Sequence, residues 1–141
     1  MKQTLITFLL VVSQIVGAQS EFTEIEKTLQ NYIEGSSYNK RNLIKSAFAD
    51  NATLYLITRD GFKRFTPTEY ANFFKNAQEG QFNGRVGKIL ALEVIGDIAT
   101  AKVEIKIPKS KVTYIDLFLL KKLGNNWKII SKTAKKIDEN W

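Results

Sequence analysis

The sequence predicts a single α+β domain in which helices come first and an antiparallel sheet completes the fold. In the N-terminal half, apolar residues recur at helical spacing, whereas the C-terminal half holds long strand-like runs separated by short Gly/Asn turns. The resulting order is α-α-β-β-α-β-β-β-β, with no internal repeat or linker. Helices segregated to one face of an antiparallel sheet define the α+β class.

The first 18 residues are predicted to be a secretory signal peptide and not part of the domain. A basic start at Lys2 is followed by an apolar stretch over residues 5–12 and by the small residues Gly17 and Ala18. This stretch is too short to serve as a permanent membrane anchor. We expect cleavage after Ala18, which leaves a mature domain over residues 19–141 in the periplasm or outside the cell. The alternative is a buried N-terminal helix.

The composition excludes several kinds of chemistry. The 141 residues contain neither cysteine nor histidine, so a thiolate nucleophile, a Cys/His zinc site and a Ser-His-Asp triad are ruled out. Any proton transfer would depend on Asp, Glu, Tyr or Lys, and we expect no cofactor. The net charge is +7, but the lysines between residues 121 and 136 are dispersed along a strand pattern. We therefore expect them to form a solvated face and edge, not a nucleic-acid surface.

Three helices are expected before the main sheet. Residues 21–33 carry one apolar face and end at Gly35, and residues 40–48 form a second, shorter helix. Residues 66–80 form the third, because Thr66, Pro67 and Glu69 match a capping box with proline at the first helical position. Its expected buried stripe comprises Tyr70, Phe73, Phe74 and Ala77.

The strands are expected to pair as hairpins. Asp60-Gly61 joins residues 53–58 to 62–66, and Gly96-Asp97 joins residues 85–95 to 98–108. A Gly-Asn-Asn turn joins residues 111–122 to 127–137. In the strand at 98–108, Ala99, Val103 and the residues in phase with them face inward, whereas Glu104 faces outward.

One ionisable group interrupts the apolar run VTYIDLFLL, and this is Asp116. Strand alternation places it on one face with Tyr114 and Phe118. If that face borders a hollow, burial favours the neutral carboxyl, which could donate a hydrogen bond to a ligand carbonyl. Alternatively, Asp116 is paired with a tyrosine hydroxyl or a lysine on a neighbouring strand, because buried polar groups are almost always satisfied.

Two stretches resemble the nuclear transport factor 2-like superfamily. These are YIEGSSYNKRNLIKSAFADNATLYL, residues 32–56, and YIDLFLLKKLGNNWKIISKTAK, residues 114–135. The resemblance implies that the α+β fold is a cystatin-like roll, a cone in which a strongly curved sheet wraps around helices and encloses a pocket. Within the superfamily, the second stretch is most similar to the putative lumazine-binding and SnoaL-like group.

The ketosteroid isomerases of this superfamily supply a candidate site. The resemblance places their helix tyrosine at Tyr32, their late-strand aspartate at Asp116 and their general base at Leu56. Leucine cannot accept a proton, so the chain departs from the isomerase pattern at the residue that performs the chemistry. The pocket that the resemblance implies is lined by Tyr32, Phe48, Tyr55, Leu56, Phe73, Tyr114, Asp116 and Phe118.

The leading expectation is therefore a secreted domain that binds a small apolar or aromatic molecule without catalysis. We also expect a homodimer formed through the outer face of the sheet, no nucleic acid and no stable membrane anchor. A second hypothesis is an isomerase or dehydratase that uses Tyr32 and Asp116 together with a base such as Glu93 or Glu104. A third is a protein-interaction module whose pocket is vestigial.

Overall fold

The computed structural model describes the backbone of residues 2–137 and the side chains of residues 19–137. The expected signal peptide therefore lies outside the described side chains. The described elements are α1 (Lys2–Ser37), α2 (Arg41–Ala47), β1 (Phe48–Thr58), β2 (Gly61–Phe65), α3 (Pro67–Ala71), the 3-10 turn η1 (Asn72–Phe74), β3 (Val86–Ile95), β4 (Ile98–Ile107), the 3-10 turn η2 (Pro108–Ser110), β5 (Val112–Leu123) and β6 (Asn126–Ile137).

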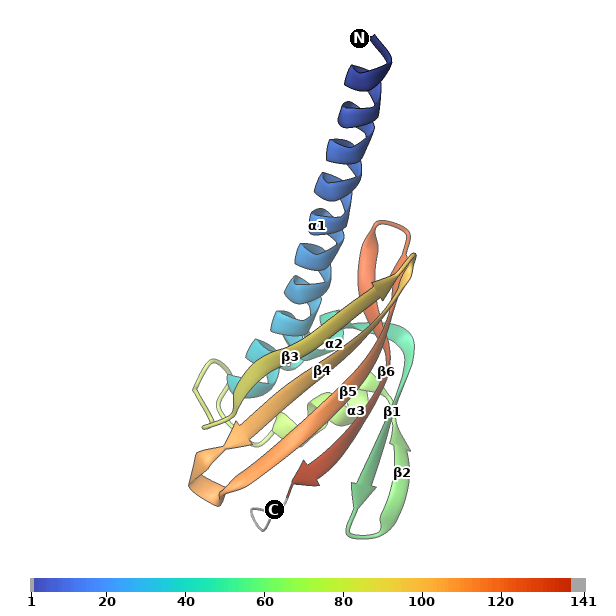
Figure 1. The fold of residues 1–141 in the computed structure, drawn as a ribbon. Coiled ribbons are helices and arrows are strands. Elements are labelled where there is room, and N and C mark those ends of the chain that lie inside the picture. Colours follow the sequence, from blue (N-terminus) through green and yellow to red (C-terminus); the bar gives the residue numbers. More distant parts are fainter. Residues whose placement is uncertain (1, 138–141) are drawn as a thin grey trace.

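The strands form one curved, open sheet of six strands in the order β2-β1-β6-β5-β4-β3. The helices pack on one face of this sheet (Figure 1), and the predicted α+β class is confirmed. The three predicted hairpin turns join β1 to β2, β3 to β4 and β5 to β6, and all three pairs are antiparallel. β1 and β6 pair in parallel, so the N-terminal hairpin extends the sheet beside the last strand.

Helix α1 runs past its predicted end and continues to Ser37. Gly35 does not stop the helix. A Cβ atom at Gly35 would lie 2.7 Å from the backbone nitrogen of Ile44, so glycine is needed there to let α2 approach α1. The chain leaves the helix at Asn39, which has φ of 58°.

The N-terminal half of α1 projects beyond the sheet, with no other element beside it (Figure 1). Within residues 2–137, no helix is both long and apolar enough to cross a membrane.

Helix α3 begins as predicted but is shorter. Thr66 accepts a hydrogen bond from the backbone of Glu69, whose side chain in turn accepts one from the backbone N–H of Thr66. The helix ends at Ala71 and passes into a 3-10 turn, which changes the angular spacing of the following side chains. Of the predicted buried stripe, Tyr70 is buried and Phe74 is half-buried. The prediction is wrong for Phe73, which is 56% exposed, and for Ala77, which is also exposed.

The core lies between the helices and the facing side of the sheet. Strand β4 alternates as predicted, with Ala99, Ala101, Val103 and Ile105 buried. These residues pack with the buried face of α1, which contributes Ile25, Leu29, Tyr32 and Ile33.

A register shift in β6 changes which of its side chains point inward. Trp127 and Ile129 are buried before the shift. In the pairing with β5, Ile129 lies opposite Leu120 and Ser131 lies opposite Leu119, so the shift falls between these two pairs. After the shift the buried phase moves by one residue, so that Lys132 is only 3% exposed. The expectation that all lysines of this segment are solvated is therefore wrong for Lys132.

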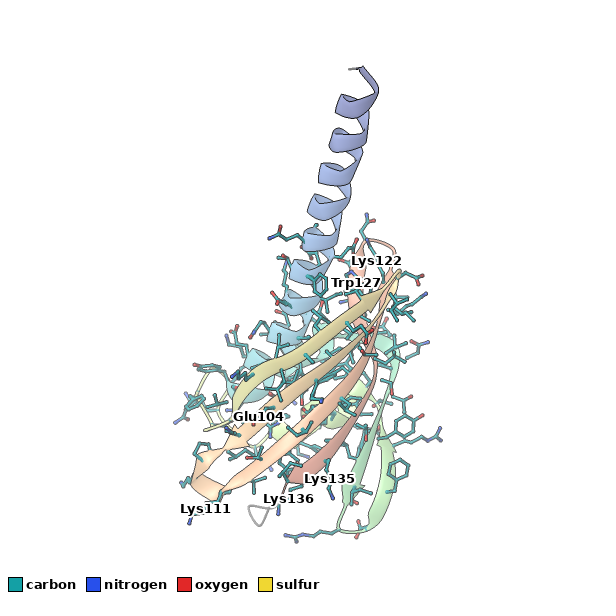
Figure 2. The ribbon with its side chains drawn as sticks, in the orientation of Figure 1. Glu104, Lys111, Lys122, Trp127, Lys135 and Lys136 are labelled. Carbon is teal, nitrogen blue, oxygen red and sulfur yellow. The ribbon has the colours of Figure 1, made fainter. Side chains whose placement is uncertain are left out.

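The last hairpin is fastened to α1 by Glu21. Its carboxylate accepts a hydrogen bond of 2.5 Å from the indole nitrogen of Trp127 and forms an ion pair with Lys122. Figure 2 shows Lys122 and Trp127 beside α1, at the opposite end of the strands from Lys135 and Lys136. These contacts lower the pKa of Glu21, chiefly through the hydrogen bond from Lys122.

Candidate functional site

A chain of buried polar side chains lies at the centre of the fold, around Asp116. The Tyr32 hydroxyl donates a hydrogen bond of 2.6 Å to Oδ2 of Asp116. The Lys132 ammonium lies 3.0 Å from Oδ1 of the same carboxylate. A third group, the hydroxyl of Tyr70, lies 2.9 Å from the Tyr32 hydroxyl. The structure thus brings together α1, α3, β5 and β6.

The donors and acceptors of this network can be assigned. A hydroxyl has one proton to donate. Since Tyr32 donates its proton to Asp116, Tyr70 must donate to Tyr32. Oδ2 of Asp116 therefore accepts a hydrogen bond, and Oδ1 forms an ion pair. Of the two interpretations of Asp116, pairing with a tyrosine and a lysine is the one that the geometry matches.

Aromatic rings surround the buried ammonium of Lys132. Its nitrogen lies 5.7 Å from the ring centre of Tyr32, 5.4 Å from that of Tyr70 and 5.9 Å from that of Phe118. These distances fall within the range of cation–π attraction. Burial, and next the charge of Asp116, raise the pKa of Tyr32 well above its ordinary value. The network is thus saturated by its own members.

Leu56, which the resemblance places at the isomerase base position, is partly buried and packs against the core. The two alternative bases do not reach the network. Glu93 is exposed, and Glu104 forms an ion pair of 3.2 Å with Lys106. Val103, immediately before Glu104, is fully buried, so strand alternation directs Glu104 to the other face. Figure 2 shows Glu104 on the outer side of β4.

The remaining predicted pocket residues fall into two groups. Phe48 and Phe118 have ring centres 6.0 and 5.0 Å from that of Tyr32, and Tyr114 is partly buried against the core. Tyr55 and Phe73 are apart from this group. Tyr55 stacks on Phe62 on the sheet face opposite Leu54, and Phe73 lies at the surface in edge contact with Tyr70.

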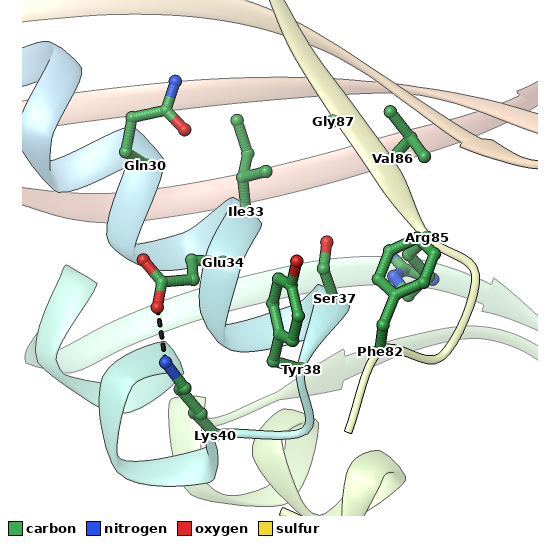
Figure 3. Close-up of a pocket in the computed structure, with 10 residues that line it drawn as sticks. All are labelled: Gln30, Ile33, Glu34, Ser37, Tyr38, Lys40, Phe82, Arg85, Val86 and Gly87. Atoms are coloured by element: carbon green, nitrogen blue, oxygen red, sulfur yellow. Dashed lines mark hydrogen bonds and ion pairs between the residues drawn. The ribbon is translucent and has the colours of Figure 1, made fainter. Parts of the chain in front are cut away.

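A cavity of about 580 Å³ lies elsewhere, between the C-terminal end of α1 and the start of β3 (Figure 3). Its volume is within the range of small-molecule sites. The cavity is lined by Gln30, Ile33, Glu34, Ser37, Tyr38, Lys40, Phe82, Arg85, Val86 and Gly87. None of the residues predicted to line the pocket is among them.

The loop between η1 and β3 closes one side of this cavity and is held to the end of α1 by two asparagines. The Asn39 amide donates to the carbonyl oxygens of Gln78 and Gln81, at 3.0 and 2.9 Å. The Asn83 amide donates to Oδ1 of Asn39 and to the Ser36 carbonyl, both at 2.7 Å. Because the loop is fastened in this way, Phe82 lies 5.5 Å from Tyr38 between ring centres.

The floor of the cavity depends on a glycine. A Cβ atom at Gly87 would lie 2.5 Å from Cγ2 of Ile33 and 3.1 Å from Cδ1 of Ile105. Only a residue without a side chain lets the first residues of β3 approach α1 this closely. This approach brings Arg85 and Val86 to the cavity opposite Ser37 and Tyr38 (Figure 3).

Arg85 is the unusual charge of the cavity. Its Nε is buried and has no hydrogen-bond partner among the described residues. Its guanidinium carbon lies 5.5 Å above the ring of Phe74. Burial acts to lower the pKa of Arg85, but interactions with Tyr70, Tyr32 and Asp116 outweigh it and raise the pKa, so the side chain stays charged. Arg85 thus lies between the cavity and the buried network.

Sequence reasoning did not find this cavity. Asn83-Gly84 was a recognisable turn signal immediately before Arg85, but it predicts a turn and not what the turn encloses. Within the described residues, no group of three or more acidic side chains is placed to hold a metal ion.

The comparisons with known proteins agree with this fold. A family model described as "Putative lumazine-binding" matches residues 20–134. The chain belongs to this family. The match covers the first stretch that resembles the nuclear transport factor 2-like superfamily and all but the last residue of the second, and that resemblance is confirmed. No curated protein matches the chain.

Several solved structures are similar to this member of the family. A protein of unknown function from Shewanella baltica, described as NTF2-like, has a TM-score of 0.74 at 20% identity, over 85% of this chain and 96% of that one. A cystatin-like domain of unknown function from Nostoc punctiforme has a TM-score of 0.67 at 15% identity, over 86% and 80%. A ketosteroid isomerase-like protein from Erwinia carotovora atroseptica has a TM-score of 0.62 at 16% identity, over 84% and 97%. At these identities the similarity concerns the fold alone, and it agrees with the predicted cystatin-like roll.

Proposed function

We propose that this family member binds a small, partly aromatic molecule in the cavity between α1 and β3 and does not catalyse a reaction on it. The observation that carries the proposal is the cavity itself. It combines exposed aromatic rings with a few polar groups, which is the usual composition of a small-molecule site. Phe82 is 51% exposed and pairs with Tyr38, so a flat ligand gains apolar contact on both.

The absence of catalysis is proposed from the buried network. Isomerisation of the ketosteroid type needs a base and a free oxyanion donor near the substrate. Leu56 replaces the base, and the proton of Tyr32 is engaged by Asp116. The other oxygen of Asp116 forms an ion pair with Lys132, so both of its oxygens are engaged within the network. The isomerase alternative would be supported if the protein isomerised a β,γ-unsaturated ketosteroid faster than buffer does.

Ligand screening by thermal shift tests the binding proposal. Riboflavin, lumazine and a neutral steroid represent three flat ring systems, and a specific ligand at about 100 times its Kd should stabilise the fold by about 2.7 kcal/mol. Phe82→Ala should weaken that shift. Phe62→Ala is the matched control, because Phe62 is a 65% exposed phenylalanine outside the cavity. Equal losses in both variants would place binding elsewhere, and no shift with any compound would favour the interaction-module alternative.

We also propose that the domain is exported and that residues 1–18 are removed. The basic, apolar and small residues follow the signal-peptide order, and the family match begins only at residue 20. Intact-mass measurement of the protein recovered from a secreting bacterial host tests this. A mature chain that starts at Gln19 is expected, and a full-length chain retained in the cytoplasm would contradict export.

The outer sheet face supports a proposal of homodimerisation. Leu90, Leu117 and Leu119 are exposed there, on the side away from the helices. On β4, Lys102 lies opposite Leu117 of β5, and Glu104 lies two residues further along the strand. A two-fold axis between two copies can therefore place Lys102 of one copy against Glu104 of the other. Light scattering should therefore show a dimer that Leu117→Lys dissociates. Phe82→Lys, at a 51% exposed side chain in the loop before β3 and outside the sheet, is the control that should leave the dimer intact.

A further inference from the structure

We propose that the cavity selects ligands that carry a carboxylate, which Arg85 binds through its guanidinium. This inference rests on the proposed binding function and adds the chemical class of the ligand: a flat aromatic acid with one negative charge.

The first argument is the unpaired charge of Arg85. Among the described residues it forms no ion pair, and its buried Nε has no hydrogen-bond partner. The two acidic side chains nearest to this region are already engaged. Asp116 is bound by Lys132 and Tyr32, and Glu34 forms an ion pair of 2.5 Å with Lys40. Arg85 is half-buried, and Asp116 attracts its charge without a direct ion pair. Its guanidinium therefore keeps donors that an external anion can accept from.

The second argument is the charge balance of the cavity lining. Its charged residues are Glu34, Lys40 and Arg85, and the first two neutralise each other. One positive charge therefore remains, which a single carboxylate matches. The planar guanidinium also suits a carboxylate, because the two groups can form a pair of parallel hydrogen bonds.

The third argument is the arrangement of the walls. Ser37 and Tyr38 approach from the end of α1, whereas Arg85 approaches from the start of β3 (Figure 3). The Ser37 hydroxyl has no hydrogen-bond partner among the described residues and lies within the lining. An aromatic ring placed on Tyr38 and Phe82 would direct a carboxylate substituent toward Arg85, with Ser37 as an additional donor.

Matched ligand pairs test the inference. Isothermal titration of the full chain would compare 2-naphthoate with 2-naphthamide and pterin-6-carboxylate with its amide, since each pair differs in charge but hardly in shape. The acids should bind at least tenfold more tightly than the amides. Arg85→Met should abolish this preference and leave the weaker amide binding unchanged, and Arg85→Lys should retain part of it.

A stability measurement separates a binding role from a structural one. Arg85 contacts Phe74 and is attracted by Asp116, so Arg85→Met should lower the melting temperature slightly while it removes the preference for acids. A variant that loses stability but keeps this preference would overturn the inference. Equal affinity for acids and amides would also overturn it, but the proposed binding function would stand. If no acid or amide bound and the screen with riboflavin, lumazine and a steroid were also negative, the proposed function itself would fail.

Discussion

Removing Lys132 should test whether the buried ion pair with Asp116 holds the fold together. Lys132→Met keeps most of the side-chain length but leaves the Asp116 carboxylate, which is 2% exposed, without its counter-ion. Breaking a buried pair by removing one partner costs about 3–5 kcal/mol. For a domain of this size, each kcal/mol corresponds to roughly 4 °C in Tm. We therefore expect the melting temperature to fall by about 10–20 °C on the same scale.

Urea unfolding, followed by tryptophan fluorescence, measures the free energy directly. The double variant Asp116→Asn/Lys132→Met removes both charges and keeps an acceptor for the Tyr32 hydroxyl, so it should be about 2 kcal/mol more stable than Lys132→Met alone. Lys63→Met is the matched control. Lys63 pairs with Asp60 at 3.1 Å, but both side chains are exposed, and such surface pairs contribute less than about 1 kcal/mol.

The result that would refute this reasoning is a Lys132→Met variant as stable as Lys63→Met. It would mean that Asp116 and Lys132 do not form a stabilising ion pair inside the folded protein. A double variant less stable than Lys132→Met would show that the two charges are not energetically coupled as a pair.

Three further predictions concern the same framework. Because the pKa of Tyr32 is raised, the folded state keeps the hydroxyl proton above about pH 10, where the unfolded chain loses it. The free energy of unfolding should therefore fall above that pH, and it should fall less steeply in Tyr32→Phe. Urea titrations at several pH values measure both slopes, and equal slopes would contradict the prediction. Gly87→Ala should lower the free energy of unfolding by about 1–3 kcal/mol, because the added methyl group crowds Ile33. Adding Ile33→Ala should restore part of this stability, and calorimetry of the single and double variants measures both effects. Thr66→Ala should cost about 1 kcal/mol through loss of the α3 cap, and a change within error in the denaturation midpoint would argue against the capping box.

Local sequence signals account for much of the fold. The hairpins at Asp60-Gly61 and Gly96-Asp97 and the cap at Thr66 each depend on residues a few positions apart. The alternation of β4 likewise identified its buried face, because side-chain direction in a regular strand has a period of two. The meeting of Tyr32 with Asp116 followed from the family resemblance, and the contact of 2.6 Å agrees with it.

Other features depend on contacts between distant segments. The register shift in β6 turns Lys132 inward, and no local pattern marks it, since lysine in an alternating strand normally faces water. The cavity requires a loop fastened by Asn39 and Asn83 and the close approach of Gly87 to Ile33.

The amino-acid sequence by itself determined the class of fold, the turns and the helix cap, because these depend on residue type and short-range spacing. The leucine at the base position is implied only by the family resemblance. Only the tertiary structure decided that Asp116 is neutralised by Lys132 and that the open cavity lies at α1 and β3, with Arg85 unpaired beside it. The physical reason is that counter-ion pairing and cavity shape arise from groups brought together across the chain, and each partner looks like an ordinary residue in its own segment.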